Sequence, residues 1–342
     1  MSPSTESGRG LPQFKTCRIS RSVVKRASPL ALFFLVAVPL LCGAATFTED
    51  FASALTNWAV HGNASLFTWN TKTRALDMTW DSRQPNSFFY HRLGTVLTRY
   101  DDFAFEFDLT LHDIEIGVTP NRPYTFEVAL GLINVRNATA TNFIRGQFSG
   151  TRNIAEFDYF PAFSSFGATV AGTIVSSNNL FAYSHNFPLE MPTDNLFHVR
   201  MEYAASNSTL TLTMTRNGEP FGPLEPIRLS ANFSDFRVDA FAISSYSNEQ
   251  ADGSILAHAI VDNITVIYPE GPLIKMAARF LSGTFEAQFA SRTNWYYQLE
   301  RTEDVSAWTA VGPFLPGTGE ELVLTHQTAG ARGFYRIRAE RP

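Results

Sequence analysis

The sequence predicts an all-β protein: an antiparallel jelly-roll sandwich followed by a small second β-sandwich domain. Apolar and polar residues alternate with period two along many segments, which is the pattern of half-buried strands. No stretch of ten or more residues shows a convincing helical period. The chain also has 30 phenylalanines, and bulky apolar side chains fill the space between two facing sheets. Strands without intervening helices favour antiparallel sheets packed face to face.

The N-terminus has the three parts of a secretory signal. A basic stretch over residues 18–26 precedes the apolar run Leu30–Leu41, and small residues follow at 43–45. We therefore predict a signal segment over residues 1–45. The apolar run is shorter than the ~20 residues that a spanning helix needs, so no stable membrane span is expected after cleavage.

Two alternatives for the N-terminus remain open. The apolar run can be an uncleaved membrane anchor, or Cys42 can be the acylated residue of a lipoprotein. Cleavage would remove both cysteines, Cys17 and Cys42, and would leave neither a disulfide framework nor a thiolate site. We expect a protein that is secreted or held at the cell surface or in the periplasm.

The strands of the larger domain follow from alternation. Phe103–Leu111 alternates apolar and polar residues, as do Phe197–Tyr203 and Thr209–Thr215. Asn217-Gly218 follows directly and closes a tight hairpin, because both residues tolerate positive φ. Further strands are expected at Tyr124–Asn134, Ile154–Phe160, Ala168–Val175, Phe236–Ser245 and Ala257–Tyr268.

A break in the pattern separates a second domain. The segment Tyr268-Pro269-Glu270-Gly271-Pro272 has the composition of a linker. We predict a sandwich over residues 46–268, a linker over 269–275 and a small domain over 276–342. Five short strands are expected in the small domain, at Ala278–Phe289, Trp295–Glu300, Trp308–Val311, Glu321–Thr325 and Phe334–Ala339.

Several short motifs resemble a known family. Glu49-Asp50-Phe51 through Trp58, the hairpin at Arg216-Asn217-Gly218 and the closing stretch 261–266 resemble concanavalin A-like lectin/glucanase domains of exported bacterial proteins. The resemblance covers roughly residues 46–268 and is one of fold, so it fixes no single activity. The tail, with Trp295–Glu300 and Gly333–Ile337, resembles a small C-terminal β module appended to many large exported proteins.

Glu156 and Asp158 are the sharpest candidates for chemistry. In a strand they share one face with Phe160, about 6–7 Å apart along the chain. The resemblance implies that retaining glucanases carry such a pair followed by another glutamate, but Phe160 and Pro161 stand there in this chain. Without that proton donor, the pair is interpreted as a sugar- or ion-binding site, as an active glycosidase with an unseen partner, or as a plain solvated strand face.

Two further sets complete the candidates. The resemblance implies a structural calcium ion between the first and last strands, where Asp50 and Asp262 would supply carboxylate oxygens; a local bulge or turn is the alternative. Phe160, Phe163 and Phe166 are expected to form a platform for sugar rings, because Pro161 and the Ser164-Ser165 pair predict a loop over the sheet.

Other functions are excluded by composition and spacing. The net charge is −5, and no basic run outside the leader supplies a footprint for nucleic acid. The seven histidines show no metal-binding spacing, and neither a nucleophile elbow nor a phosphate loop occurs.

We therefore expect an exported, non-catalytic, lectin-like protein that binds an extracellular or cell-surface polysaccharide. The first alternative is a divergent glycoside hydrolase or polysaccharide lyase that uses Glu156 and Asp158. Glu106, Asp108 and Glu127 could then provide the proton donor from a neighbouring strand. The second alternative is a structural or adhesion module without a sugar site.

The signal segment makes a direct prediction. Signal peptidase accepts small residues before its cut, so cleavage after Ala44 or Ala45 should give a secreted product that begins at Ala45 or Thr46. N-terminal sequencing of the exported protein measures this. An intact leader on membrane-bound protein would contradict it.

Overall fold

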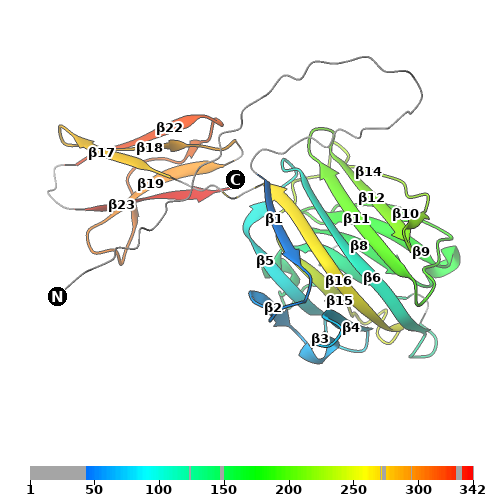
Figure 1. Cartoon of the computed structure of the whole chain (residues 1–342). Helices are drawn as coiled ribbons and strands as arrows, with labels where there is room; N and C mark the ends of the chain where they lie inside the picture. Colours follow the sequence, from blue (N-terminus) through cyan, green and yellow to red (C-terminus); the bar gives the residue numbers. More distant parts are fainter. Residues whose placement is uncertain are drawn as a thin grey trace, which may run out of the picture. The chain divides into compact units, whose positions relative to one another are not determined.

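The computed structural model describes residues 44–122, 125–146, 150–269, 271, 275–293, 295–328 and 333–341 (Figure 1). The predicted signal segment, apart from Ala44 and Ala45, lies outside the described residues, as does most of the predicted linker 269–275. In these residues the strands pair antiparallel throughout, so the predicted fold class, an all-β antiparallel sandwich, is confirmed.

Residues 44–269 form two sheets that face each other (Figure 1). The first is nine-stranded, in the order β13–β12–β11–β6–β16–β4–β3, with β1 on β16 and β14 on β12. Its strands are β1 (Ala44–Glu49), β3 (Phe67–Asn70), β4 (Ala75–Asp81), β6 (Phe103–Ile116), β11 (Leu196–Ala204), β12 (Thr209–Arg216), β13 (Glu219–Phe221), β14 (Ile227–Arg228) and β16 (Ile255–Pro269).

The second sheet is seven-stranded, in the order β10–β9–β8–β7–β15–β5–β2. Its strands are β2 (Trp58–His61), β5 (Ser87–Leu97), β7 (Val128–Ile133), β8 (Ile154–Phe160), β9 (Thr169–Val175), β10 (Phe181–Asn186) and β15 (Val238–Ser245). The strands predicted from alternation are therefore present, with ends that differ by a few residues.

The Asn-Gly hairpin forms as predicted. Asn217 and Gly218 have φ values of 51° and 87°, and Arg216 pairs with Glu219 across the turn. Positive φ at both central residues gives the turn a twist that matches the flanking strands. This turn connects β12 to the short strand β13.

The first strand of the sandwich lies beside the last. β1 pairs with residues 264–269 of β16, and β4 pairs with residues 256–261 of the same strand. Between these two stretches the register of β16 against β6 shifts after Asp262, and Asn263 has a φ of 50°. The Asp262-Asn263 pair therefore forms a bulge in the long last strand.

Phenylalanines from both sheets meet in the core. Phe107 of β6 packs edge-to-face on Phe157 of β8 at 5.7 Å between ring centroids, and Phe105 packs on Phe241 at 5.6 Å. Trp80 is fully buried and donates a hydrogen bond from its Nε1 to the Ser244 carbonyl at 2.9 Å. This bond joins β4 of one sheet to β15 of the other.

The two sheets differ on their outer faces. β12 alternates buried and exposed residues, so the nine-stranded sheet has a solvated outer face there. Every residue of β7, β8 and β9 is buried, so the middle of the seven-stranded sheet is covered on both sides. Phe143, from the segment between β7 and β8, lies on this outer face and contacts Phe88 and Tyr246.

The described helices are short: α1 (Val135–Ala138) and the 3-10 turns η1 (Ala64–Leu66) and η2 (Ser164–Phe166). None of the described helices has the length and the apolar character that crossing a membrane requires. α1 lies in the segment that covers the seven-stranded sheet, and η2 lies in the loop after β8.

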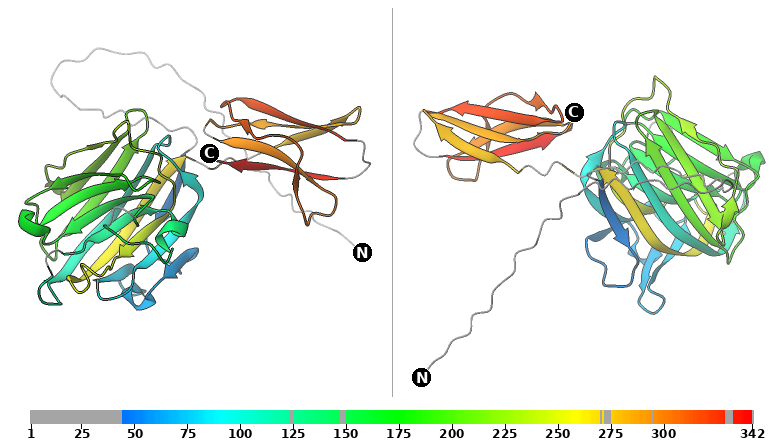
Figure 2. Two further views of the ribbon diagram at one scale, coloured as in Figure 1. Left: turned by 180° about the vertical axis from the view of Figure 1, so that it is seen from behind. Right: turned by 45° about the horizontal axis from the view of Figure 1, so that its top comes forward.

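The C-terminal residues form two small sheets with their own apolar cluster (Figure 2). The predicted single strand Ala278–Phe289 is wrong. Ser282 and Gly283, both with positive φ, turn the chain into a hairpin of two strands. The strands are β17 (Ala277–Leu281), β18 (Thr284–Ala290), β19 (Tyr296–Thr302), β20 (Thr309–Ala310), β21 (Leu315–Pro316), β22 (Glu321–Gln327) and β23 (Phe334–Glu340).

Gly131 makes the covered face testable, and Gly172, whose Cβ would point into the core, provides a control. A Cβ on Gly131 of β7 would lie 2.5 Å from the Glu156 Cα and would also clash with the Ala155 carbonyl oxygen. Since backbone atoms cannot move aside, Gly131→Ala should lower the free energy of unfolding by about 2 kcal/mol or more. Gly172→Ala is the matched control, because the nearest atom there is the flexible Ile227 Cδ1 at 3.2 Å. Urea denaturation measures both, and equal losses would contradict the prediction.

Candidate functional site

Glu156 and Asp158 lie on the outer face of the seven-stranded sheet. Phe157, between them, points into the core, so its neighbours on β8 point the other way. Glu127 comes two residues before Ala129, the register partner of Asp158, and joins the same cluster. Oxygen atoms of the three carboxylates lie within 4.8 Å of one another, and all three side chains are buried. We call Glu127, Glu156 and Asp158 the acidic cluster.

Arg145 covers the acidic cluster on the outer face of the sheet. Its guanidinium contacts all three carboxylates: Nη2 lies 2.6 Å from Glu156 Oε1 and 3.2 Å from Asp158 Oδ2, and Nε lies 3.0 Å from Glu127 Oε1. The Arg145 side chain is itself only 6% exposed. The segment between β7 and β8 thus inserts a cation into the face that carries the predicted Glu156–Asp158 pair.

Neutral side chains add hydrogen bonds to the network. The Tyr246 hydroxyl donates to Glu156 Oε2 at 2.8 Å, and the Thr173 hydroxyl donates to Asp158 Oδ2 at 2.5 Å. The Arg145 guanidinium also lies over the Tyr246 ring, 5.4 Å from its centroid. These bonds satisfy part of the network, since Glu127 Oε1 and Asp158 Oδ1 are buried oxygens for which the described residues provide no hydrogen bond. The cluster is therefore built from β8 and β9, from Glu127 just before β7 and from Tyr246 just after β15.

Burial changes the protonation of the cluster. It raises the pKa of Glu127 to about 7, an effect that Arg145 opposes and the Glu156 carboxylate reinforces. Burial and the neighbouring Glu156 raise the pKa of Asp158 well above its ordinary value. Burial opposes the charge of Arg145, yet the three carboxylates raise the pKa of its guanidinium. The cluster thus buries less negative charge than three carboxylates in water would carry.

The acidic cluster has the donor set of a metal site but already contains a cation. Three carboxylates at this spacing suit a hard divalent ion. The guanidinium of Arg145 touches all three, however, and occupies the space that such an ion would need. The chain's own arginine therefore provides the positive charge.

Asp50 and Asp262, predicted as calcium ligands, lie near each other at the β1–β16 edge. Burial raises the pKa of Asp262, and Asp108, Asp50 and Glu49 reinforce the shift. Each aspartate has a local role, since Asp50 accepts from the Ala52 amide at 3.0 Å and Asp262 from the Asn263 amide at 2.8 Å. Among the described residues, the group of three acids close enough to share an ion does not include either aspartate. Calcium at this edge remains a prediction.

The other acids considered as proton donors lie elsewhere. Glu106 and Asp108 belong to β6 of the nine-stranded sheet, where Arg200 pairs with Glu106 at 2.7 Å and His198 with Asp108 at 2.8 Å. Glu127 does reach the Glu156–Asp158 pair. Of the three donors considered, the structure brings only Glu127 into the cluster.

A set of aromatic rings continues from the cluster to the sheet edge. We call Phe163, Phe166, Tyr183, His185 and Phe187 the aromatic surface. Ring centroids lie 4.4 Å apart for Tyr183–His185, 4.8 Å for His185–Phe163, 5.9 Å for Phe163–Phe166 and 4.4 Å for Phe166–Phe187. Tyr183, Phe166 and Phe187 are 56%, 43% and 47% exposed. Aromatic rings that face water at this density are available for a ligand.

Strand register places the aromatic surface beside the acidic cluster. His185 of β10 pairs with Ala171 of β9, which in turn pairs with Asp158 of β8. Phe160 lies at the end of β8, is 9% exposed, and contacts Phe163 at 4.9 Å. Of the four predicted ligand-binding residues, Phe163 faces the surface, Phe160 supports it, and Glu156 and Asp158 are buried.

Sequence reasoning missed most of this site. Arg145 stands in an irregular segment with no motif around it, so its position gave no signal. The aromatic residues of β10 did give a signal in the sequence. Phe181, Tyr183 and His185 alternate with small residues, which indicates that they share one face of a strand. Several other large aromatics are core residues, including Trp80, Phe88 and Tyr159.

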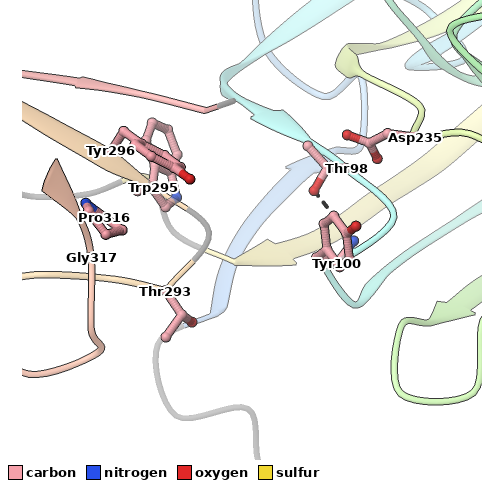
Figure 3. Close-up of a pocket in the computed structure, with 8 residues that line it drawn as sticks. All are labelled: Thr98, Tyr100, Asp235, Thr293, Trp295, Tyr296, Pro316 and Gly317. Atoms are coloured by element: carbon pink, nitrogen blue, oxygen red, sulfur yellow. Dashed lines mark hydrogen bonds between the residues drawn. The ribbon is translucent and has the colours of Figure 1, made fainter. Parts of the chain in front are cut away.

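A further pocket involves other residues. Figure 3 shows Thr98, Tyr100 and Asp235 of the sandwich, where the Tyr100 amide donates to the Thr98 hydroxyl at 3.4 Å. It also shows Tyr296, the first residue of β19, and Trp295, which precedes that strand. None of these residues belongs to the acidic cluster or to the aromatic surface.

The chain is similar to known proteins in structure, but its sequence matches no family model and no curated protein. Among solved structures, a lectin I from Ulex europaeus in complex with the methyl glycoside of α-L-fucose has 15% identity and a TM-score of 0.45, over 66% of this chain and 98% of the lectin.

Two other solved structures are similarly distant. The lectin UEA-II, complexed with galactose, has 12% identity and a TM-score of 0.44, over 66% of this chain and 99% of the lectin. The alginate lyase Aly36B has 9% identity and a TM-score of 0.38, over 65% of this chain and 96% of the lyase. These likenesses are too distant to assign a ligand or an activity.

The buried acidic cluster predicts a pH dependence of stability. Glu127 has a pKa of about 7 when folded and an ordinary value of 4.5, so between these values the folded state holds a proton that the unfolded state has released. The free energy of unfolding should therefore fall as pH rises from about 4.5 to about 7, by up to about 1.4 kcal/mol per pH unit for this proton. Asp158 acts in the same direction.

Glu127→Gln should flatten this fall, because glutamine does not titrate. The measurement is urea denaturation at a series of pH values across the same range. Glu249→Gln, at an exposed glutamate, is the control and should leave the slope unchanged. A wild-type slope that persists in Glu127→Gln would show that other groups cause it.

Proposed function

We propose that this protein is an exported, non-catalytic carbohydrate-binding protein that holds a polysaccharide on the aromatic surface. The observation that carries the proposal is the contrast between two adjacent parts of one sheet face. The carboxylates are sealed by Arg145, whereas Tyr183, Phe166 and Phe187 present rings to water. Sugars present apolar C–H faces, and aromatic rings of this kind stack against them. Export rests on the predicted signal segment.

The state of the acidic cluster supports binding over catalysis. A general acid must reach the proton-accepting oxygen of its substrate within hydrogen-bond distance. Glu156 and Asp158 are 0% exposed and Glu127 is 2% exposed, and the Arg145 guanidinium fills the space above them. A sugar chain cannot approach these carboxyls while Arg145 is in place.

A second candidate function follows from Glu127. Its raised pKa, about 7, suits a general acid, and with Glu156 and Asp158 it completes a set of three carboxyls. This favours a glycoside hydrolase or polysaccharide lyase in which the Arg145 segment moves aside. Release of reducing sugar or of unsaturated products from glucans, galactans and uronates, abolished in Glu156→Gln, would establish this function in place of binding.

The aromatic surface makes the decisive prediction. Each exposed ring should contribute about 1 kcal/mol, so the double variant Tyr183→Ala/Phe166→Ala should weaken glycan binding by about thirtyfold. Tyr100→Ala/Phe280→Ala is the matched control, because it removes one tyrosine and one phenylalanine of similar exposure outside the aromatic surface. Isothermal titration against glycans selected on an array measures the affinities. A protein that binds no glycan would support a structural or adhesion role.

A further inference from the structure

We propose that the aromatic surface selects neutral polysaccharides and rejects polyuronates and other acidic glycans. This inference rests on the proposed function and specifies the ligand class of the same site. It follows from the charged groups next to the rings. None of the comparisons assigns a ligand class to this surface.

The aromatic surface offers stacking and neutral hydrogen bonds. Phe163, Phe166 and Phe187 contribute rings without polar atoms, and the Tyr183 hydroxyl and the His185 ring nitrogens are its side-chain hydrogen-bonding groups. Tyr183 stacks on His185 with an angle of 25° between the planes, and it remains 56% exposed. Hydroxyl groups of a neutral sugar match such partners.

The cation that acts on the aromatic surface through His185 is not available to a ligand. Burial lowers the pKa of the His185 imidazole, and the charge of Arg145 lowers it further. Its guanidinium is buried, however, and is already shared among three carboxylates. None of the described arginines that lie over an aromatic ring covers a ring of the aromatic surface. The rings that they cover are those of Tyr90, Tyr100, Phe221, Tyr246, Trp295, Trp308 and Phe314.

The charged groups beside the rings balance one another and leave no free cation. His185 is aligned through Ala171 with Asp158, two strands away, which corresponds to about 10 Å. Three carboxyls surround one guanidinium there, so the cluster has no excess of positive charge. A sugar carboxylate brought onto the rings would lose hydration without gaining an ionic partner, and this is unfavourable.

The experiment uses pairs of polysaccharides that differ only in oxidation at the sixth carbon. The secreted chain is titrated with β-1,4-mannan and β-1,4-polymannuronate, and with β-1,4-glucan and β-1,4-polyglucuronate, at low and at high salt. We expect at least one neutral member to bind at least tenfold more tightly than its uronate. Its affinity should change less than twofold with salt, because no ion pair forms. The Tyr183→Ala/Phe166→Ala variant should lose this binding.

The outcomes separate the two proposals. If a uronate binds as tightly as its neutral partner and the double variant loses this binding, the selectivity is overturned. The aromatic surface then remains the binding site. A glycan that binds equally to wild type and to the double variant would overturn the proposed site, and the selectivity with it. Circular dichroism verifies that both proteins are folded, which is expected because the substituted rings lie at the surface.

Discussion

The contact of the Arg145 guanidinium with Glu127, Glu156 and Asp158 organises the functional face of this sandwich. Three acids on adjacent strands would repel one another if they were buried without a cation. The arginine makes their burial possible, and Tyr246 and Thr173 satisfy further oxygens. Removing one partner from such a network typically costs about 3–5 kcal/mol, because the remaining charges stay buried. The segment between β7 and β8 is therefore fixed to the sheet by electrostatics as well as by Phe143.

This closure changes what the fold can do. An open sheet face lined by carboxyls is suited to acid–base chemistry on a sugar, whereas a closed one leaves only its margin for a ligand. Here the margin is β10 and the loop after β8, where five aromatic rings contact one another. The same arginine that neutralises the acids also withholds its charge from any ligand on the rings. The proposed binding site and the proposed ligand class thus both rest on one buried network.

The larger framework depends on simpler forces. Phenylalanines of β6 and β15 or β8 interlock across the core, and the long strand β16 joins β1, β4 and β6. The bulge at Asp262-Asn263 lets one strand serve two partners on the same edge. These features explain the local pattern of residues at the β1–β16 edge without reference to an ion.

The sequence by itself determined the strands, since alternation such as Phe103–Leu111 reflects burial of one face and needs no long-range information. It also determined the hairpin at Asn217-Gly218, because positive φ restricts the residues that fit there. It placed Glu156 and Asp158 on one face of a strand, but it did not determine whether that face is open to a ligand. Only the tertiary structure decided this, because Arg145 reaches the acids from 11 to 18 residues away in the chain, through an irregular segment without periodicity. The aromatic surface likewise joins residues of two separate segments, and contacts between segments leave no local pattern to read.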